Sequence, residues 1–491
     1  MIDPKRLPLL IRTVSTTLEN AGFEAYLVGG CVRDLLLGRT PKDWDFTTNA
    51  TPEQIQALFP DSFCNNDYGT VGIKAPETET DPTLQVIEVT PYRSESTYSD
   101  SRRPDSVTFG VSLEADLARR DFTVNAIAYR LKDNKTIDLY EGMADLEAKR
   151  LRAVGDPDER FKEDALRMMR AVRLAAELEF VIEGETMAAI LRQADRLKLI
   201  AIERITIEFL RLIDSRTPMQ GIIFLEKLGM LKYIMPELLE GIGCEQGGIH
   251  AFDVYEHNLR TLQAAADKGY STEMRLAALL HDIAKPATRR TGGKNKTYTF
   301  FGHEVVGAKM AKQILSRLRL PREQIAVVEK LVRWHMFFAD PDEITLAAVR
   351  RTIVRIGEDQ IENLLNLRVC DRIGTGRPKE QPFRFRRYKA MVDEARRDPV
   401  SVKLLKLNGD KIMEITGEKP GKKLGYILHA LLEEVLIDPR KNTEEYLKTR
   451  VFELVKLSED ELLVLAEAGK AKQAEEEAAA LKAIAKEHQV G

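Results

Sequence analysis

The chain has 491 residues, of which 44% are hydrophobic and 31% are charged, and this composition excludes a mainly disordered protein. Such a length is too great for one hydrophobic core and predicts three or four packed units. The near balance of 74 basic and 77 acidic residues excludes a chain that coats nucleic acid indiscriminately, although a local basic surface remains compatible with it. Four scattered cysteines and the lack of a long apolar run predict a soluble cytoplasmic protein with no membrane segment.

The first 150 residues mix the helical and the strand periods. Apolar spacing and turn residues predict helices over residues 7–22, 31–38 and 51–59, the last of them capped by Thr51. Strands are predicted over residues 24–30, 42–49, 84–93 and 123–131. We therefore expect an α+β head with a small sheet.

The rest of the chain is almost entirely helical in its pattern. Residues 151–240 predict a helical neck with helices over 161–178, 185–200 and 202–214. Residues 241–385 predict a helical domain rich in histidine, and residues 386–491 a helical tail that ends in an Ala/Glu/Lys segment. The last thirty or so residues suggest no function.

Two acids follow a glycine pair in the stretch YLVGGCVRDLLLGRTPKDWDF, residues 26–46. Residues i and i+2 of a strand point to the same face, so Asp43 and Asp45 would project together and bind Mg²⁺. Glu88, on the strand VIEVT, would supply a third acid if that strand lies alongside. D-x-D alone is more often solvated charge on a surface strand.

The glycine pair strengthens the metal interpretation. Gly29 and Gly30 would let a triphosphate approach the backbone where strand gives way to helix, and Arg33 lies on the first turn of that helix. Together with D-x-D, within one β-α-β stretch, this pattern is far more specific than either part and predicts nucleotidyl transfer.

The stretch closely resembles the head of the class II tRNA nucleotidyltransferase/poly(A) polymerase family, which includes the CCA-adding enzymes. The resemblance continues through RRDFTVNAIAY, residues 119–129, and through residues 152–178, and it covers at least residues 24–240. It implies a polymerase-β-like head followed by an all-α neck, body and tail.

Two arginines and an acid precede the strand at residues 123–131. Taken alone, Arg119, Arg120 and Asp121 fit a surface salt-bridge cluster, although the arginine fork also suits phosphate. The resemblance implies that Arg120 contacts the nucleotide. Asp121 matches a second such position and could accept a hydrogen bond from the ribose.

The segment EDALRMMRAVR, residues 163–173, places an acid and an arginine three residues apart. Asp164 and Arg167, three apart on the expected helix, would be neighbours, either as an ion pair or as acceptor and donor for the edge of a base. The resemblance implies a protein template that selects CTP and then ATP, and the residues that match its nucleotide contacts are Glu163, Asp164, Arg167, Arg170 and Arg173.

Residues 92–109 form a polar segment that is longer than a hairpin needs. Taken alone it fits a surface loop. The resemblance implies the flexible loop that switches specificity from C to A and that CC-only relatives lack. It favours CCA addition over CC addition and does not separate CCA-adding from A-adding enzymes.

Histidines and acids recur through residues 257–371 in the order H…HD…H…H…D. Imidazole and carboxylate ligate first-row transition metals, although a lone helical histidine is more often an ordinary core residue. The order resembles the HD phosphohydrolase superfamily. In that match the core ligands are His257, His281, Asp282 and Asp371, and the possible second-metal ligands are His303 and His335.

The expected activity is template-independent addition of CCA to the tRNA 3′ end from CTP and ATP, with Mg²⁺ in the head. The HD match adds a candidate phosphohydrolase on 2′,3′-cyclic phosphates that uses Ni²⁺, Mn²⁺, Fe²⁺ or Co²⁺, for repair of damaged tRNA. In the tail, Lys422, Lys423 and Arg440 are candidate tRNA phosphate contacts. Neither DNA nor a membrane is an expected partner.

Three alternatives remain open from the sequence. One is an A-adding enzyme or poly(A) polymerase on the same head. Another is a protein whose main activity is HD phosphohydrolysis. The third is an RNA-binding scaffold with vestigial domains, against which the complete ligand sets count.

Overall fold

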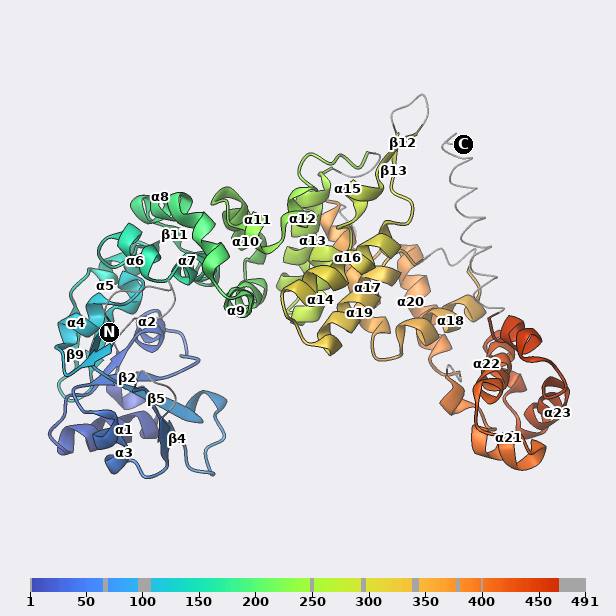
Figure 1. Cartoon of the computed structure of the whole chain (residues 1–491), viewed down its shortest axis with the longest axis horizontal. Coiled ribbons are helices and arrows are strands. Elements are labelled where there is room, and N and C mark those ends of the chain that lie inside the picture. The colour runs from blue at the N-terminus through green and yellow to red at the C-terminus, as the bar shows by residue number, and fades with distance from the viewer. Residues whose placement is uncertain are drawn as a thin grey trace. The chain divides into compact units, whose positions relative to one another are not determined.

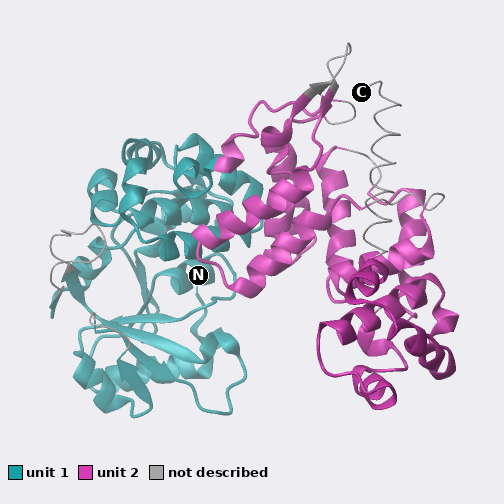
Figure 2. Ribbon diagram, turned by 45° about the vertical axis from the view of Figure 1, so that its right-hand side comes forward, with its two compact units in different colours: residues 1–236 teal, residues 237–491 magenta. Residues whose placement is uncertain are grey.

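The computed structural model describes residues 2–64, 69–95, 107–247, 251–292, 297–337, 344–376, 380–398 and 401–467. The chain divides into two compact units, residues 1–236 and residues 237–491 (Figure 2). The predicted α+β fold, with a small sheet near the N-terminus and helices in the remainder, is confirmed (Figure 1). The finer division into four domains stays a prediction. None of the described helices is both long and apolar enough to cross a membrane.

A seven-stranded sheet forms the centre of the head. In spatial order its strands are β3 (Ser62–Cys64), β4 (Val71–Lys74), β5 (Val86–Pro91), β2 (Asp45–Thr48), β1 (Tyr26–Val28), β8 (Ile127–Arg130) and β9 (Lys135–Asp138). Only β2 and β5 are parallel neighbours; the other neighbours in this sheet are antiparallel. The smaller pairs are β6 (Arg93–Glu95) with β7 (Val107–Phe109), and β10 (Arg150–Leu151) with β11 (Val181–Ile182).

Helices surround this sheet and then continue alone. Those of the head are α1 (Leu9–Asn20), α2 (Gly30–Leu36), α3 (Pro52–Leu58), α4 (Leu113–Ala118) and α5 (Gly142–Glu147). They are followed by α6 (Pro157–Glu163), α7 (Leu166–Leu178), α8 (Gly184–Gln193), α9 (Ile202–Ile213), α10 (Pro218–Lys227) and α11 (Leu231–Ile234). The predicted Thr51 cap is confirmed as a capping box with Gln54.

The core of the head fixes the end of β1 beside the start of β2. All three residues of β1 are buried, and Tyr26 and Val28 pack with Tyr92, Leu117 and other buried side chains. Because Leu27 pairs with Phe46 in an antiparallel register, the chain leaves β1 next to the point where it enters β2. Gly29 and Asp45 are therefore brought together by the sheet.

Two local expectations were wrong. The strand expected over residues 42–49 begins at Asp45, and Lys42 and Asp43 form a bend. The helix expected over residues 161–178 is interrupted, because Asp164 has extended backbone angles (φ −143°, ψ 104°) and its side chain accepts a hydrogen bond from the Leu166 amide. A short acidic side chain that bonds nearby backbone amides competes with helix continuation in this way.

The second unit consists mainly of helices. They are α13 (Val254–Asp267), α14 (Thr272–Leu280), α15 (Lys285–Thr288), α16 (His303–Arg317), α17 (Arg322–Trp334), α18 (Leu346–Ile356), α19 (Ile361–Gly374) and α20 (Phe383–Ala395). Towards the C-terminus follow α21 (Gly409–Thr416), α22 (Lys422–Ile437) and α23 (Glu444–Leu454). The short helix α12 (Pro236–Leu239) crosses the unit boundary, and β12 (Arg290–Gly292) pairs with β13 (Thr297–Thr299).

Parts of two predictions fall outside the described residues. Residues 96–106 of the expected flexible loop are outside them, and its two ends pair as β6 and β7. Residues 468–491 of the tail are also outside them. Of the candidate tRNA contacts, Lys423 bonds to Glu418 and Arg440 bonds to Asp438, whereas Lys422 is exposed at the start of α22.

Candidate active sites

Gly29 marks the turn between β1 and α2. Its φ of +80° is a conformation that residues with a side chain rarely adopt. A Cβ atom added here would lie 3.2 Å from Arg120 Nη1 and 3.5 Å from Asp45 Oδ2. The missing side chain thus leaves room between a predicted phosphate contact and a predicted metal ligand.

The second glycine faces the other two predicted residues of this site. A Cβ atom on Gly30 would lie 3.6 Å from Arg33 Nη2 and 3.9 Å from Asp43 Oδ1. Arg33 donates hydrogen bonds to Asp34 and, across the head, to Asn125 Oδ1, each at 2.8 Å. The glycine pair is therefore surrounded by two carboxylates and two guanidinium groups.

The third predicted acid lies on the neighbouring strand. Asp45 on β2 is directly opposite Glu88 on β5 in the parallel register. Burial, followed by the negative charges of Asp43 and Glu88, raises the pKa of Asp45 to about 7, although the charge of Arg120 acts in the opposite direction. Three acids that crowd one another in this way fit a site for a hard cation, which would relieve their repulsion.

These acids are more widely spaced than the ligands of a closed metal cluster. Among the described residues, the groups of three or more ligand atoms that all lie within 4.8 Å of one another are both in the second unit. An open group of carboxylates of this kind suits Mg²⁺, because that ion keeps several positions for water and for substrate phosphate.

Arg120 and Asp121 have different environments. Arg120 donates to the buried Asp116, while its Nε atom is buried and has no hydrogen-bond partner among the described residues. Asp121 accepts from the Phe122 amide, from Asn125 and from Arg170. Burial acts to raise the pKa of Asp121, but the charge of Arg170 and the hydrogen bonds outweigh it and lower that pKa.

Arg170 and Arg173, the last two predicted nucleotide contacts, share a buried partner on α9. Arg173 Nε lies 2.5 Å from Glu208 Oε2 and Arg170 Nη1 lies 3.9 Å from Glu208 Oε1. Arg173 also bonds to Glu177. Since Arg173 and Glu208 are only 6% and 4% exposed, their interaction joins α7 to α9 in the interior.

Replacement of Glu208 with alanine should destabilise the first unit by about 1–3 kcal/mol, because the buried Arg173 loses one of its two carboxylate partners and keeps only Glu177. Urea unfolding followed by Trp44 fluorescence in a Trp334→Phe background would measure this. Glu159→Ala, which removes an exposed ion pair with Lys162, is the control and should have a much smaller effect, because solvent screens exposed pairs. An equal, small effect of both variants would contradict the prediction.

The residues of the E-D-x-x-R motif lie at the break between α6 and α7. Asp164 accepts from Arg204 on α9, with Arg204 Nη2 2.6 Å from Asp164 Oδ2. Arg167 donates to Glu163 at 2.5 Å and to the Arg119 carbonyl at 3.0 Å. The expectation that Asp164 and Arg167 lie on one continuous helix is therefore wrong, although the Arg167 amide donates to the Asp164 carbonyl at 3.0 Å; the two side chains have separate partners.

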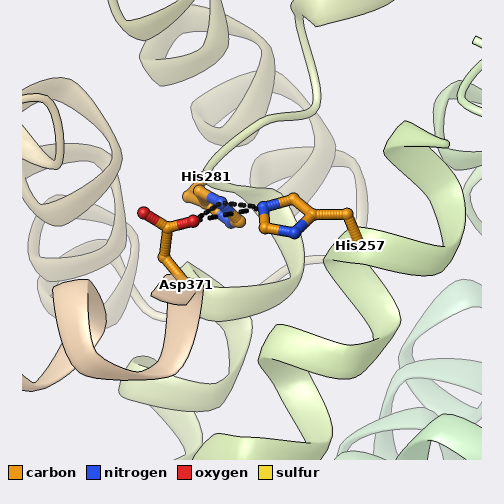
Figure 3. A group of neighbouring side chains, drawn as sticks. All are labelled: His257, His281 and Asp371. Carbon is orange, nitrogen blue, oxygen red and sulfur yellow. Dashed lines mark hydrogen bonds and ion pairs between the residues drawn. The ribbon is translucent and has the colours of Figure 1, made fainter. Parts of the chain in front are cut away.

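The histidines and acids of the second unit converge on one buried centre. His257 comes from α13, and His281 follows α14; Asp371 lies on α19 (Figure 3). His257 Nε2 lies 3.1 Å from His281 Nε2 and 3.3 Å from Asp371 Oδ1. These three residues form the first of two groups whose ligand atoms are close enough to hold one metal ion.

Asp282 joins this group to the second one, which consists of Asp282, His303 and His335. Asp282 Oδ2 is 3.2 Å from His257 Nε2, whereas Asp282 Oδ1 is 3.3 Å from His303 Nε2. His303 Nε2 and His335 Nε2 are 3.2 Å apart. All six predicted residues of this domain are thus brought together, and Asp282 can serve both groups at once.

Three histidines of this centre are oriented through their other ring nitrogen. Nδ1 of His281, His303 and His335 lies 2.9, 2.7 and 2.7 Å from the carbonyl oxygens of Ala278, Phe300 and Val332. A carbonyl can only accept, so each Nδ1 carries the proton and each Nε2 offers a lone pair to the centre. This arrangement is typical of histidines that ligate metal.

The electrostatics of the centre differ between its two groups. Burial acts to lower the pKa of His257, but hydrogen bonds to Asp282 and Asp371 outweigh it and raise that pKa to about 9. Burial lowers the pKa of His335 to about 4. A histidine must be neutral to ligate, so metal at the first group would displace a proton from His257.

The sequence reasoning missed several polar residues that support these sites. Arg204 holds Asp164, Glu208 joins Arg170 to Arg173, and Lys285 donates to Asp282 at 2.6 Å and to Gln246 at 2.7 Å. Arg204 and Glu208 belong to an ordinary amphipathic pattern. Lys285 follows His281-Asp282 by one helical turn, and this spacing could have indicated it.

Family models match three segments of the chain. They describe a "Poly A polymerase head domain" over residues 25–152, a "Probable RNA and SrmB- binding site of polymerase A" over residues 179–241 and an "HD domain" over residues 254–374. The matched order is the order that the resemblance implied.

Relatives and solved structures match almost the whole chain. It is 35% identical over 446 residues to the CCA-adding enzyme of Levilactobacillus brevis, covering 90% of this chain and 97% of that one. It is 33% identical to the CCA-adding enzyme of Ligilactobacillus salivarius, with 90% of this chain and 94% of that one covered.

The crystal structure of the Bacillus stearothermophilus CCA-adding enzyme in complex with CTP has a TM-score of 0.67 at 26% identity, covering 91% of this chain and 98% of that one. The Thermotoga maritima CCA-adding enzyme complexed with tRNA shares the fold, with a TM-score of 0.52 at 20% identity and 92% and 96% covered. The chain belongs to the family of CCA-adding enzymes.

Proposed function

We propose that this protein completes the 3′ end of tRNA by adding CCA from CTP and ATP, without a nucleic-acid template and with release of pyrophosphate. The observation that carries the proposal is the glycine pair between β1 and α2: Asp45 and Arg120 lie beside Gly29, and Asp43 and Arg33 lie beside Gly30. Family membership supports it, as does the CTP complex of the Bacillus stearothermophilus relative.

Different residues of the head would bind the metal ion and the triphosphate during nucleotidyl transfer. Asp43, Asp45 and Glu88 would hold Mg²⁺, and the bound ion would align the α-phosphate and lower the pKa of the RNA 3′-hydroxyl. Gly29 lets the triphosphate approach the backbone, and Arg33 and Arg120 neutralise its charge with charge-assisted hydrogen bonds. The contribution of the chain is thus positioning and electrostatic stabilisation.

The residues that would select the base lie in the proposed neck, residues 151–240. Asp164 offers a carboxylate that can accept from an amino group, and Arg167 offers donors that can bond to a ring nitrogen. Glu163 and the Arg119 carbonyl keep Arg167 in place. Asp121, Arg170 and Arg173 complete the proposed nucleotide contacts, with Asp121 and Arg170 paired as one unit.

The four domains proposed for the protein are a head (1–150), a neck (151–240), an HD-type domain (241–385) and a tail (386–491) that contacts tRNA. The proposed localisation of the protein is the cytoplasm, where tRNA, ATP and CTP are available.

A second activity is favoured by the His/Asp centre of the HD-type domain. We propose that His257, His281, Asp282 and Asp371 hold one transition metal and that His303 and His335 hold a second one together with Asp282. The donor set suits Ni²⁺, Mn²⁺, Fe²⁺ or Co²⁺, any of which would supply a Lewis acid for hydrolysis of 2′,3′-cyclic phosphate at damaged tRNA ends.

The deciding experiment incubates the protein with tRNA that lacks its last three nucleotides, in the presence of CTP and ATP. Incorporation of two C residues and one A residue is expected. Failure to add C to this tRNA, together with addition of A to tRNA that already ends in CC, would instead identify an A-adding enzyme, and long A tails would identify a poly(A) polymerase. Either result would overturn the proposed function.

A further inference from the structure

Asp164 lies between two helices and is held by an arginine from a third. Arg204, in the first turn of α9, donates to both oxygens of the Asp164 carboxylate, at 2.6 Å to Oδ2 and at 3.4 Å to Oδ1. The Leu166 amide bonds to Asp164 Oδ1 at 3.0 Å. Since the Asp164 backbone is extended, helical geometry does not fix this side chain, and its hydrogen bonds do so: a local one from Leu166 and the tertiary ones from Arg204.

Arg167 is positioned by other groups. Glu163 and the Arg160 carbonyl bond to its Nη1, and the Arg119 carbonyl bonds to its Nη2. The two residues of the proposed template are therefore fixed separately. Arg204 is the side chain that keeps Asp164 directed towards α9. Arg167 lies only three residues further along the chain and has other partners.

The separation of the two residues determines which bases they can bind. Cytosine and adenine both present an amino group next to a ring nitrogen without a proton, which suits a carboxylate acceptor beside a guanidinium donor. Uracil and guanine present a carbonyl next to an N–H group, the opposite pattern. If Asp164 turned towards Arg167, acceptor and donor would satisfy each other and the pattern would be lost.

We propose that Arg204 is a positioning residue for nucleotide selection, which keeps the Asp164 carboxylate apart from Arg167 and available to the amino group of cytosine or adenine. This inference rests on the proposed function. Arg204 acts through Asp164 and does not itself contact the base. Its guanidinium fork matches a carboxylate in two places, which the single ammonium group of lysine does not.

Arg204→Ala should lower kcat/KM for both CTP and ATP by about 10–100-fold, because small misplacement of a binding group has effects of this size. The ratio of CTP to UTP incorporation should fall by at least about tenfold. Arg204→Lys should recover part of both losses, since it keeps the charge and loses the fork.

Arg192→Ala is the matched control. Arg192 on α8 forms an analogous interhelical ion pair with Asp158 on α6, with one guanidinium group on two carboxylate oxygens. Its removal should leave the CTP to UTP ratio unchanged. Urea unfolding of both variants, followed by Trp44 fluorescence in the Trp334→Phe background, tests whether loss of structure alone explains a change.

A double-mutant cycle with Asp164→Ala identifies the route of the effect. If Arg204 acts through Asp164, adding Arg204→Ala to that variant should cause less than a twofold further change in the CTP to UTP ratio. An Arg204→Ala variant with the ratio of the unmodified protein would overturn the inference while leaving the proposed function intact. If the unmodified protein adds neither C nor A to tRNA, the proposed function itself fails.

Discussion

Asp45→Asn is expected to lower the rate of nucleotide addition by about 10²–10³-fold or more while leaving the head folded. Asparagine keeps the shape of the side chain but removes a charge from the group that it forms with Asp43 and Glu88. Loss of a carboxylate weakens a divalent-cation site directly. Incorporation of labelled CTP into tRNA that lacks its end would measure the effect.

The same change should stabilise the metal-free protein. The pKa of Asp45 is raised from its ordinary value of 3.8 to about 7, so the folded state binds this proton more tightly than the unfolded state does. The stability due to that proton is complete below pH 3.8 and is lost as the pH rises through 7. The advantage of Asp45→Asn over the unmodified protein should therefore grow from pH 4 to pH 7 and then level off.

Chelator-treated protein, unfolded in urea at each pH, gives this comparison. Asp61→Asn, which changes an exposed acid just before β3, is the control and should alter neither nucleotide addition nor the pH profile. If Asp45→Asn added nucleotides at the rate of the control, the proposed metal site would be in the wrong place.

Local pattern predicted part of the head: the helices α1, α2 and α3, the strands β1, β2, β5 and β8, and the residues around its glycine turn. The strands β3, β4 and β9 and the helices α4 and α5 were not predicted. The amphipathic spacing of α1, the Thr51 cap and the glycine pair are all properties of neighbouring residues, and the structure confirms them. The pairing of Asp45 with Glu88 was a conditional prediction, and the parallel register of β2 and β5 fulfils that condition.

The supporting contacts could not be predicted in the same way, because they join residues that are distant along the chain. Arg204 lies 40 residues from Asp164, and Glu208 lies 35 residues from Arg173. In the sequence each is an ordinary charge on an amphipathic helix. The break at Asp164 was missed for a related reason, since the residues around it have good helix propensity and the side-chain bond to Leu166 decides the outcome.

The histidine-rich centre shows the same limit. The order of its six predicted ligands was visible in the sequence, and the resemblance implied four core ligands and two for a second metal. The sequence did not show that the two oxygens of Asp282 face different histidines. That arrangement becomes visible only when five helical segments are packed together.

Asp282→Asn is expected to remove bound metal from both groups, whereas a histidine variant should affect chiefly one. His257→Ala should weaken the group that includes His281 and Asp371, and His335→Ala should weaken the group that includes His303. In the Asp282 variant, an amide replaces the one carboxylate that faces both groups, and amide oxygen is a poor ligand for these metals. Metal analysis after dialysis against Mn²⁺ or Ni²⁺ would compare the three variants.

Asp282→Asn should lower the activity proposed for the second unit and leave the activity proposed for the first unit nearly unchanged. Hydrolysis of 2′,3′-cyclic phosphate should fall by at least about 100-fold in Asp282→Asn. Addition of C and A should remain within about twofold, because Asp43, Asp45 and Glu88 all belong to the first unit. Asp267→Asn, an exposed acid at the end of α13, is the control for both measurements. An Asp282 variant that kept the full metal content would show that its carboxylate does not bridge the two groups.

Since Asp282 is buried and bonded to Lys285, the variant should also destabilise the second unit by about 3–5 kcal/mol, and Trp334 fluorescence in a Trp44→Phe background would detect that loss separately.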